Sequence, residues 1–246
     1  MKANWSMAAL GGIGGAVLAI AAVLGLAYSG LLPSRSDTAI HDYLMAHPEI
    51  LIDMSSKLQA QQQASDDAAR QAAVDKLGIK AFFNPDIAFI TGPKDAKTTL
   101  VEFFDYNCPF CRASSPAFEA YYNKHKGDVR FAFIEFPIKG QNSIAATRLA
   151  LAARKQPDKY LALHFALMRE DTEATPATVV AMAKKVGLDL KKLQSDVEDP
   201  SIGATIAAAH ALAQAANIDG TPAFIVNGKV REGAIDDNAL KAMLKG

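Results

Sequence analysis

The chain has 246 residues, half of them hydrophobic, which is enough for one well-packed domain with smaller appendages. Lysine plus arginine and aspartate plus glutamate balance at 26 each, so no basic excess points to a nucleic-acid partner. The two cysteines are too few for a disulfide scaffold, and the small ring that they would close stabilises a fold very little. Their role is therefore expected to be chemical.

Residues 1–33 differ in kind from the rest of the chain. Residues 7–32 are uncharged and mostly apolar, and this run is longer than the roughly 20 residues that span a bilayer. A signal sequence usually has an apolar region of about 7–15 residues before a small-residue cleavage site, which Ala27-Tyr28-Ser29 fits loosely. We expect an inner-membrane anchor, with a cleaved signal sequence as the alternative. Either one implies export to an oxidising exterior compartment, where a dithiol pair can cycle as an oxidant.

Residues 34–80 are predicted to form a helical stalk. Its seam residues follow one another at spacings of four and three, the pattern of helix association: Ile40, Leu44, His47, Leu51, Met54 and Leu58. An interior proline costs a helix about 3 kcal/mol, so Pro48 should divide the stalk into helices at about 37–46 and 48–77. Because this stripe cannot build a core alone, we expect residues 37–78 to form a homo-oligomer, a dimer or a trimer. Packing on the chain's own domain is the alternative.

Residues 81–246 are predicted to form an α/β domain. Strands are expected at 86–92, 98–106 and 129–137, with a helix at 109–125. A strand–helix–strand unit of this length makes a right-handed crossover between parallel strands. A block of helices follows at about 143–217. The chain then returns to two strands, joined at Asn227-Gly228, a strong two-residue hairpin signal, and ends in a helix at 236–246.

Cys108 directly follows the apolar strand and precedes Pro109. Proline is favoured at the first position of a helix, which places Cys108 at the N-cap. Free backbone amides and the positive end of the helix dipole favour a thiolate there, and thiol pKa values in such C-x-x-C settings fall to roughly 3.5–7.5. Cys111 lies one turn further on, within reach of Cys108, and should be more buried and less acidic.

Other uses of the thiol pair are weaker. A structural zinc site needs a second pair of cysteine or histidine ligands, and the five histidines show no such spacing. We therefore expect no metal ligands, although two thiolates could also hold Cu(I). A passive loop staple does not explain the position of the pair between a strand and a helix.

Glu102 lies inside the same apolar strand, six residues before Cys108. A buried carboxyl is costly unless it is paired or held neutral by a raised pKa. At strand period Glu102 projects from the same face as Phe104 and Tyr106, under the helix that begins after Cys108. It could therefore exchange protons with Cys111. A location in water at the edge of the sheet is the alternative.

Thr221 and Pro222 precede the first strand of the hairpin. A proline that opens a strand removes a donor from the ladder and favours a special conformation such as a cis bond. We expect such a bond to turn the Thr221 backbone outward, where it can pair with an extended substrate segment. Phe110, with Phe104 and Tyr106, could add an apolar docking surface.

Together, "EFFDYNCPFC", the inserted helices and "GTPAFIVNG" resemble the DsbA-type thioredoxin-fold disulfide oxidoreductases over residues 81–246. The resemblance implies a thioredoxin core, Cys108 as the attacking thiol, Cys111 as its partner, Glu102 as proton acceptor and cis-Pro222 beside them. Pro109 and Phe110, between the cysteines, would contact the substrate together with Thr221. The oxidising prototype has histidine where this chain has Phe110, so we expect a weaker oxidant.

The segment "IHDYLMAHPEILIDMSSKLQAQQQ" is similar to the N-terminal helical region of the suppressor-of-copper-sensitivity C (ScsC) branch. That branch includes forms that trimerise through this region and isomerise disulfides.

The predicted function is the formation, reduction or isomerisation of disulfides in unfolded or misbridged exported proteins. No cofactor is expected beyond the redox-active Cys108–Cys111 disulfide. A membrane redox partner protein would restore the redox state of that disulfide after each reaction. Two other classes stay open. One is a Cu(I)-binding protein that uses the same thiols in copper tolerance, and the other is a holdase chaperone whose stalk forms a cup.

Overall fold

The computed structural model describes residues 21, 25 and 35–245. All of the predicted membrane segment at 7–32 except residues 21 and 25 lies outside this range, so the anchor stays a prediction. Among the described residues, no helix combines the length and the apolar character needed to cross a bilayer. The chain divides into two compact units between Gln63 and Ala64.

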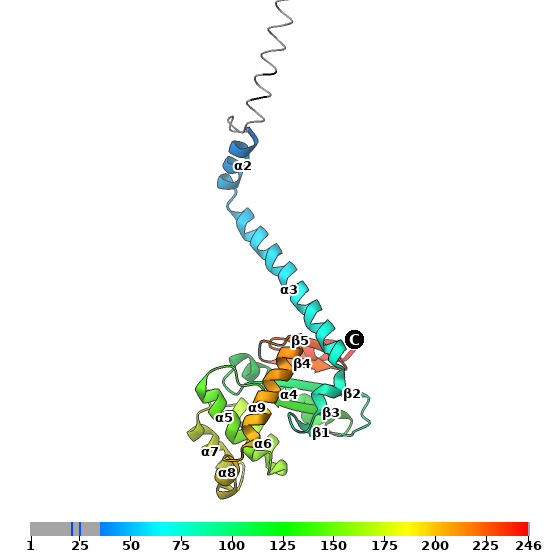
Figure 1. Cartoon of the computed structure of the whole chain (residues 1–246), viewed down its shortest axis with the longest axis vertical. Helices are drawn as coiled ribbons and strands as arrows, with labels where there is room; N and C mark the ends of the chain where they lie inside the picture. Colours follow the sequence, from blue (N-terminus) through cyan, green and yellow to red (C-terminus); the bar gives the residue numbers. More distant parts are fainter. Residues whose placement is uncertain (1–20, 22–24, 26–34, 246) are drawn as a thin grey trace, which may run out of the picture. The chain divides into compact units, whose positions relative to one another are not determined.

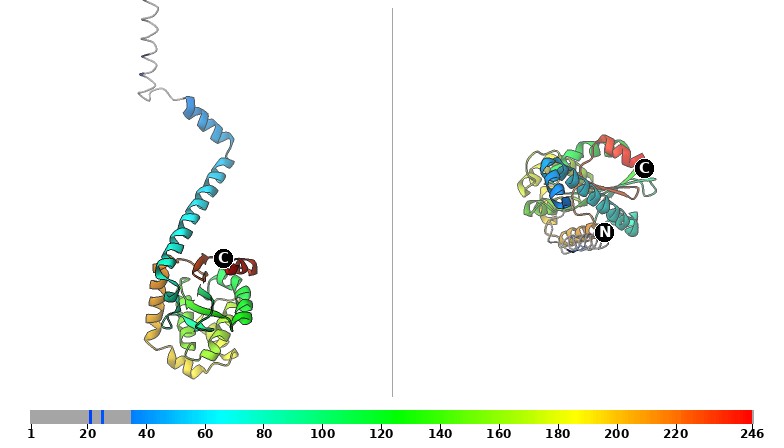
Figure 2. Two further views of the ribbon diagram at one scale, coloured as in Figure 1. Left: turned by 90° about the vertical axis from the view of Figure 1, so that its right-hand side faces the viewer. Right: turned by 90° about the horizontal axis from the view of Figure 1, so that it is seen from above.

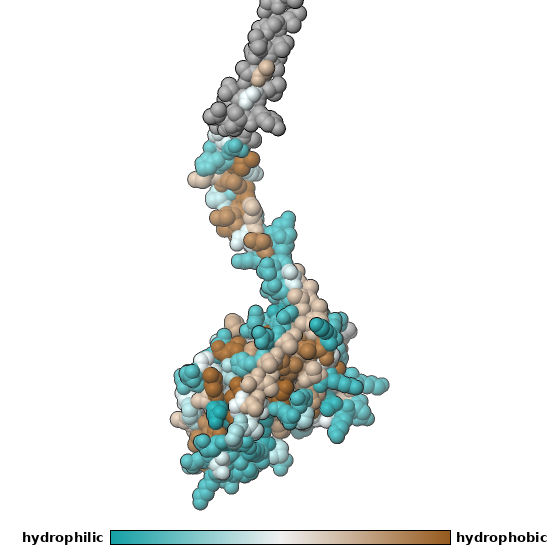
Figure 3. Space-filling view, viewed as in Figure 1, coloured by the Kyte–Doolittle hydropathy of each residue, from teal (hydrophilic) through white to brown (hydrophobic). Residues whose placement is uncertain are grey.

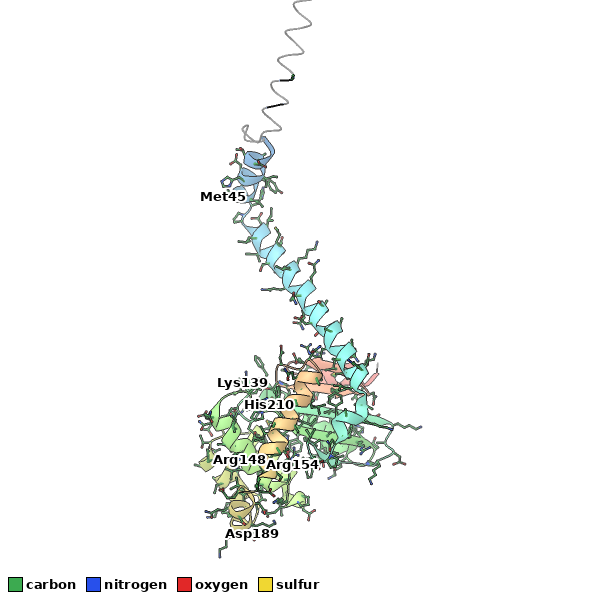
Figure 4. All side chains as sticks on the ribbon, viewed as in Figure 1. Met45, Lys139, Arg148, Arg154, Asp189 and His210 are labelled. Atoms are coloured by element: carbon green, nitrogen blue, oxygen red, sulfur yellow. The ribbon has the colours of Figure 1, made fainter. Side chains whose placement is uncertain are left out.

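The first unit contains α2 (Arg35–Ala46) and the beginning of α3 (Glu49–Leu77). The two helices meet at Pro48, as expected, and the Leu51 amide donates to the Pro48 carbonyl oxygen. The large apolar side chains of this unit are exposed. Figure 3 shows brown surface over α2, and Met45 projects from this helix in Figure 4. The exposed apolar side chains are Ile40, Tyr43, Leu44, Met45, Leu51, Ile52, Met54 and Leu58.

The second unit is built on a five-stranded sheet (Figure 1). Its strands lie in the order β1-β3-β2-β4-β5 and are β1 (Phe89–Thr91), β2 (Thr98–Phe104), β3 (Val129–Glu135), β4 (Ala223–Val226) and β5 (Lys229–Glu232). Only β2 and β3 are parallel, as the predicted crossover requires. Asn227 and Gly228 join β4 to β5 with φ angles of 49° and 86°, the left-handed pair that a tight hairpin turn needs.

Helices cover both faces of this sheet (Figure 2). In chain order they are η1 (Ile79–Phe83), α4 (Pro109–His125), α5 (Gln141–Ala153), α6 (Pro157–Met168), α7 (Pro176–Lys185), α8 (Leu190–Asp196), α9 (Ser201–Ala215) and α10 (Asp237–Lys245). The helix α4 makes the crossover from β2 to β3, and the five helices α5–α9 lie between β3 and β4. The unit is therefore a mixed α/β fold with inserted helices.

The side chains of β2 alternate between two hydrophobic cores, one on each face of the sheet. Leu100 and Phe104 face the core that also contains the two cysteines and side chains of α4, α6 and α10. Val101 and Phe103 face the opposite core, formed with η1, α9 and the end of α3. Glu102 alternates with Leu100 and Phe104, so its carboxyl belongs to the cysteine side of the sheet.

A buried ion pair ties the inserted helices to the sheet. The Glu135 carboxylate at the end of β3 pairs with Arg154, and it also accepts the Tyr160 hydroxyl hydrogen at 2.7 Å. Arg154 donates further to the carbonyl oxygens of Ile87 and Phe133. Nothing in the sequence pattern pointed to this pair, because the partners are brought together only by the packing of α5 and α6 on β3.

Candidate active site

Cys108 occupies the N-cap of α4, and Pro109 is the first residue of that helix. The Cys108 amide donates to the Asp105 carbonyl oxygen, which closes a tight turn after β2. Both cysteines are free and buried. The sequence-based placement of the sulfur at the beginning of the helix is therefore confirmed.

The surroundings lower the pKa of the Cys108 thiol to about 5. The largest cause is a hydrogen bond from the Cys111 side chain, and the Thr221 side chain and the amides of Cys111 and Phe110 add to it. Burial acts in the opposite direction, because it disfavours the charged form. The net result is a sulfur that is a thiolate at neutral pH and therefore a nucleophile.

Cys111 has the opposite character. Burial raises the pKa of its thiol well above the ordinary value, and the adjacent Cys108 sulfur raises it further. The charge of Glu102 also raises the pKa of the Cys111 thiol, so the carboxyl and this thiol interact electrostatically. The pair thus consists of one sulfur that is readily ionised and one that holds its proton.

Glu102 is 2 % exposed, and burial raises the pKa of its carboxyl to about 8. The expected position beneath α4 is confirmed, and the carboxyl is protonated at neutral pH. Its Oε2 atom has no hydrogen-bond partner within the described part of the chain. The nearest ionisable contact is His164, a residue of α6 that the sequence reasoning did not select.

The Thr221–Pro222 bond is cis, as expected. In its protonated form the Cys108 thiol donates to the Thr221 carbonyl oxygen, with the sulfur and oxygen atoms 3.0 Å apart. This carbonyl therefore faces the reactive sulfur, and the expected pairing of the Thr221 backbone with an extended substrate segment stays a prediction. Cys108 and Thr221, which are 113 positions apart in the sequence, are thus neighbours in space.

Asp105 holds the turn that carries Cys108. Its side chain is fully buried. One carboxylate oxygen accepts the Asn107 amide, and the other accepts the amides of Ile138 and Lys139 at 2.7 and 2.9 Å. The sequence reasoning missed Asp105, although an acid at the end of an apolar strand, three residues before a cysteine, is a signal of its own.

Asn107 and Arg112 fasten the same turn to the inserted helices. Asn107 exchanges two hydrogen bonds with the backbone of Ala174. Arg112 donates to the carbonyl oxygens of Tyr106 and Thr172 at 3.1 and 2.8 Å. The loop between α6 and α7 therefore braces the N-terminus of α4.

The exposed surface beside Cys108 is formed by Pro109 and by Phe110, which is 61 % exposed. Phe104 and Tyr106 are fully buried, so the suggestion that they add to a docking surface is wrong. Both rings pack edge-on against His164 instead. No group of three or more His, Cys, Asp or Glu side chains is arranged around a metal position in the described residues.

Two family models match the chain. The one described as thioredoxin covers residues 85–246, and the one described as the copper resistance protein ScsC N-terminal domain covers residues 37–65. The ScsC match ends within α3, and the thioredoxin match begins after that helix has ended.

Solved structures agree with these matches. A thioredoxin-like oxidoreductase from Silicibacter pomeroyi DSS-3 is 38% identical, with a TM-score of 0.62, and the alignment covers 68% of this chain and 96% of that one. The catalytic domain of Proteus mirabilis ScsC is 30% identical, with a TM-score of 0.62 and coverage of 71% and 96%. BcfH of Salmonella enterica Typhimurium is 29% identical, with a TM-score of 0.66 and coverage of 90% and 98%.

Curated relatives include the thiol:disulfide interchange protein DsbA of Bordetella parapertussis, which is 30% identical over 54% of this chain and 65% of that protein. They also include Na⁺/H⁺ antiporters. NhaA 3 of Salinispora tropica is 29% identical over 65% of this chain but only 24% of its own length. The chain thus spans about a quarter of the first curated relatives that it matches.

Proposed function

The chain belongs to the DsbA-like family of thioredoxin-fold thiol-disulfide oxidoreductases, and from this we propose that it exchanges disulfides with exported client proteins through Cys108 and Cys111. One observation carries the proposal. Two adjacent thiols have pKa values shifted in opposite directions, one to about 5 and one well upward, beside a cis-proline loop. An inert pair of buried cysteines has no need of this asymmetry.

In the oxidised enzyme, a client thiolate attacks the Cys108 sulfur. The bond between Cys108 and Cys111 breaks, a mixed disulfide forms between the client and Cys108, and Cys111 leaves as a thiolate. A second client thiolate then attacks the client sulfur of this mixed disulfide. The client gains a disulfide and Cys108 leaves as a thiolate, so two electrons pass from the client to the enzyme.

Glu102 serves the leaving sulfur. A Cys111 thiolate in this buried position is unstable, because its pKa lies far above neutrality. Glu102, with its pKa near 8, is protonated at pH 7 and gives its proton to Cys111. In the reverse direction the carboxylate takes the proton back, and Cys111 can then attack the mixed disulfide.

The same chemistry runs in the isomerase direction when the bridge is reduced. The Cys108 thiolate attacks a wrong disulfide in the client and is released after the client has rearranged. A pKa of about 5 lies between the values of about 7 for thioredoxin and about 3.5 for the oxidising prototype. This supports a bridge of intermediate oxidising strength, whose direction is set by a membrane redox partner protein.

The trapping experiment tests this function. In a Cys111→Ser variant the partner thiol is gone, so the Cys108 thiolate should attack a disulfide of a scrambled client protein and remain bound to it as a stable mixed-disulfide adduct, with the other client sulfur released as a thiolate; the adduct is detected by mass spectrometry. Cys108→Ser is the matched control and should form none. If both variants fail to form adducts while the wild type holds Cu(I) after purification, the thiols serve copper binding instead.

We further propose the arrangement in which this activity operates. Residues 1–33 export the chain and tether it to the inner membrane through residues about 7–32, residues 34–80 form the stalk, and residues 81–246 form the exchange domain. The exposed apolar residues of α2 and α3 and the ScsC N-terminal match at 37–65 support self-association of the stalk, as a dimer or a trimer. Periplasmic location is supported by the 33% identical structure from Salmonella enterica serovar Typhimurium that is described as a periplasmic thioredoxin-like protein.

A further inference from the structure

His164 is the side chain that faces the unpartnered oxygen of Glu102. It lies on α6 and is 1 % exposed. Its Nε2 atom is 3.9 Å from Glu102 Oε2, and its Nδ1 atom is 3.5 Å from the Tyr106 hydroxyl. One imidazole therefore stands between a buried acid and a buried hydroxyl.

The proposed reaction requires Glu102 to exchange protons with solvent. With a pKa near 8, Glu102 takes up a proton at pH 7 after it has given its own to Cys111, and it must lose that proton again before it can deprotonate Cys111 in the reverse direction. Its neighbours across the sheet are Phe133 and Phe224, and the side chain is 2 % exposed, so water does not reach the carboxyl directly. A client attached to Cys108 closes the site further. A proton must then travel through side chains.

Groups that can carry a proton continue beyond His164. Burial, and after it the neighbouring Tyr160 hydroxyl, raises the pKa of Tyr106, and the Tyr160 hydroxyl donates to Glu135. Glu135 is paired with Arg154, the residue labelled in Figure 4. Arg154 lines a surface cavity of about 510 Å³, together with Pro85, Asp86, Ser201, Ala204, Thr205 and Ala208. None of the residues beside Cys108 contributes to that cavity.

The charges around His164 suit a relay. The titratable and charged groups that face it are Glu102 on β2, Tyr106 in the following turn, Tyr160 on α6 and Arg154 at the C-cap of α5. Burial, with a smaller effect of Arg154, lowers the pKa of the imidazole to about 3. His164 is thus neutral at physiological pH, and a neutral imidazole has one donor and one acceptor nitrogen, which allows it to take a proton on one side and release one on the other.

Resting on the exchange function proposed above, we propose that His164 relays protons between the Tyr106 hydroxyl and Glu102. After Glu102 has given its proton to Cys111, the carboxylate takes the proton from Nε2, and Nδ1 takes the hydroxyl proton of Tyr106. Tyr106 recovers one from Tyr160, and solvent water at the Arg154 cavity supplies the proton that enters the chain through Glu135. In the opposite direction each transfer is reversed. His164 acts through Glu102, and is a positioning residue rather than a catalytic one.

The distances allow this with a small movement. Both separations exceed the roughly 2.9 Å of a strong hydrogen bond, by about 1 Å at most. Catalytic hydrogen bonds are often long in the resting enzyme and tighten when the substrate is bound. Since Glu102 and His164 belong to different elements, a slight shift of α6 against β2 closes the gap.

The test separates the two chemical steps of the full-length protein. A peptide with one thiol is reacted with the oxidised enzyme, which forms a mixed disulfide on Cys108. Samples quenched with acid give the rate at which Cys111 then releases the peptide. Alkylation of the reduced enzyme measures the reactivity of Cys108 separately. His164→Phe keeps an aromatic ring in an aromatic cage, and Tyr106→Phe removes one hydroxyl. Each should slow the Cys111 step about tenfold or more and leave the alkylation of Cys108 unchanged.

Two readouts distinguish a relay from a structural role. The double variant should be no slower than either single one, because both residues serve one path. The pH dependence of the Cys111 step should also change in both. Tyr122→Phe, which removes a hydroxyl from the same aromatic core, is the control and should behave as the wild type.

A wild-type rate and pH profile in His164→Phe would overturn the relay. If His164→Phe does not fold, the test rests on Tyr106→Phe. An unchanged rate of the Cys111 step in Tyr106→Phe would overturn the proposal equally. A wild-type protein that performs neither step would instead overturn the exchange function, and the relay with it.

Discussion

Cys108 and Cys111 are only one helical turn apart, yet their surroundings shift the two thiol pKa values in opposite directions. Cys108 is at the N-cap of α4, where hydrogen bonds from Cys111 and from free amides favour an anion. Cys111 is one turn deeper and receives mainly the penalty of burial. The asymmetry decides which sulfur attacks and which one leaves, so it is the residue-scale basis of the proposed function.

Phe110 is the residue through which this asymmetry can be adjusted. A Phe110→His variant places an imidazole beside the Cys108 sulfur, and its charged form should lower the pKa of Cys108 by roughly one unit, which makes the bridge about 30 mV more oxidising. The pKa is measured from the pH dependence of thiolate absorbance, and the potential from equilibrium with glutathione. Phe110→Leu is the control, with no change expected. An unchanged potential in the histidine variant would show that this position does not tune the bridge.

At the scale of elements, the beginning of α4 is held from two sides. Asp105 binds the segment that follows β3, and Asn107 with Arg112 binds the loop after α6. The N-cap sulfur therefore depends on two connections that are distant in sequence. Such bracing keeps the amides at the helix N-terminus aimed at Cys108.

An Asp105→Asn variant tests this bracing. The amide nitrogen cannot accept the backbone N–H groups that one carboxylate oxygen now binds, and a buried unsatisfied group costs about 1–3 kcal/mol. We expect that loss in the free energy of unfolding, together with a higher pKa of Cys108. Asp189→Asn, at the exposed N-cap of α8, is the control, because asparagine caps a helix nearly as well as aspartate. Equal effects of the two substitutions would argue against a special role for Asp105.

The stalk is the second element with a prediction of its own. Leu51 is 74 % exposed and Leu58 66 %, and seven residues separate them on the seam. If the stalk associates, Leu51→Glu with Leu58→Glu should bring the molecular mass in solution down to that of one chain, since like charges would meet at a buried seam. Ser56→Glu with Ala60→Glu lies on the opposite face of α3 and should keep the assembly. The mass is measured by light scattering, and a single-chain wild type would remove the proposal.

At the scale of the whole molecule, two buried groups should shape the pH dependence of stability. The pKa of Glu102 rises from 4.5 to about 8 on folding, so the folded protein holds an extra proton between these values and loses stability as the pH rises through them. The pKa of His164 falls from 6.5 to about 3, so the unfolded chain holds the extra proton and stability is lost as the pH falls through that interval. The two effects oppose each other between pH 4.5 and 6.5, where we expect the maximum.

This profile is measured by denaturation of a Cys108→Ser, Cys111→Ser background, in which no thiol titrates. Adding Glu102→Gln should remove the alkaline flank, with a gain of about 2–4 kcal/mol at pH 8 relative to pH 5. Adding His164→Phe should remove the acid flank. Glu198→Gln, at an exposed position, should leave both flanks in place. A flank that survives its substitution must come from another group.

Much of the fold could be predicted because its signals are local. The two helices around Pro48, the β-α-β crossover, the helical block and the Asn227-Gly228 hairpin each follow from a few neighbouring residues. Cys108 and Glu102 could be selected for the same reason, since a proline after one and an apolar strand around the other are visible in the sequence. His164 shows weakly, as the one imidazole in the apolar helix of residues 157–168.

The amino-acid sequence by itself determined the order of the elements, the sulfur at the beginning of α4 and the acid beneath it, because helix capping and strand alternation act over a few residues. Only the tertiary structure decided that the Thr221 carbonyl faces Cys108, that Asp105 and Arg112 brace the turn, and that His164 meets Glu102. These contacts join residues 33 to 113 positions apart. Their energies depend on which surfaces the sheet and the inserted helices bring together, and no local pattern encodes that choice.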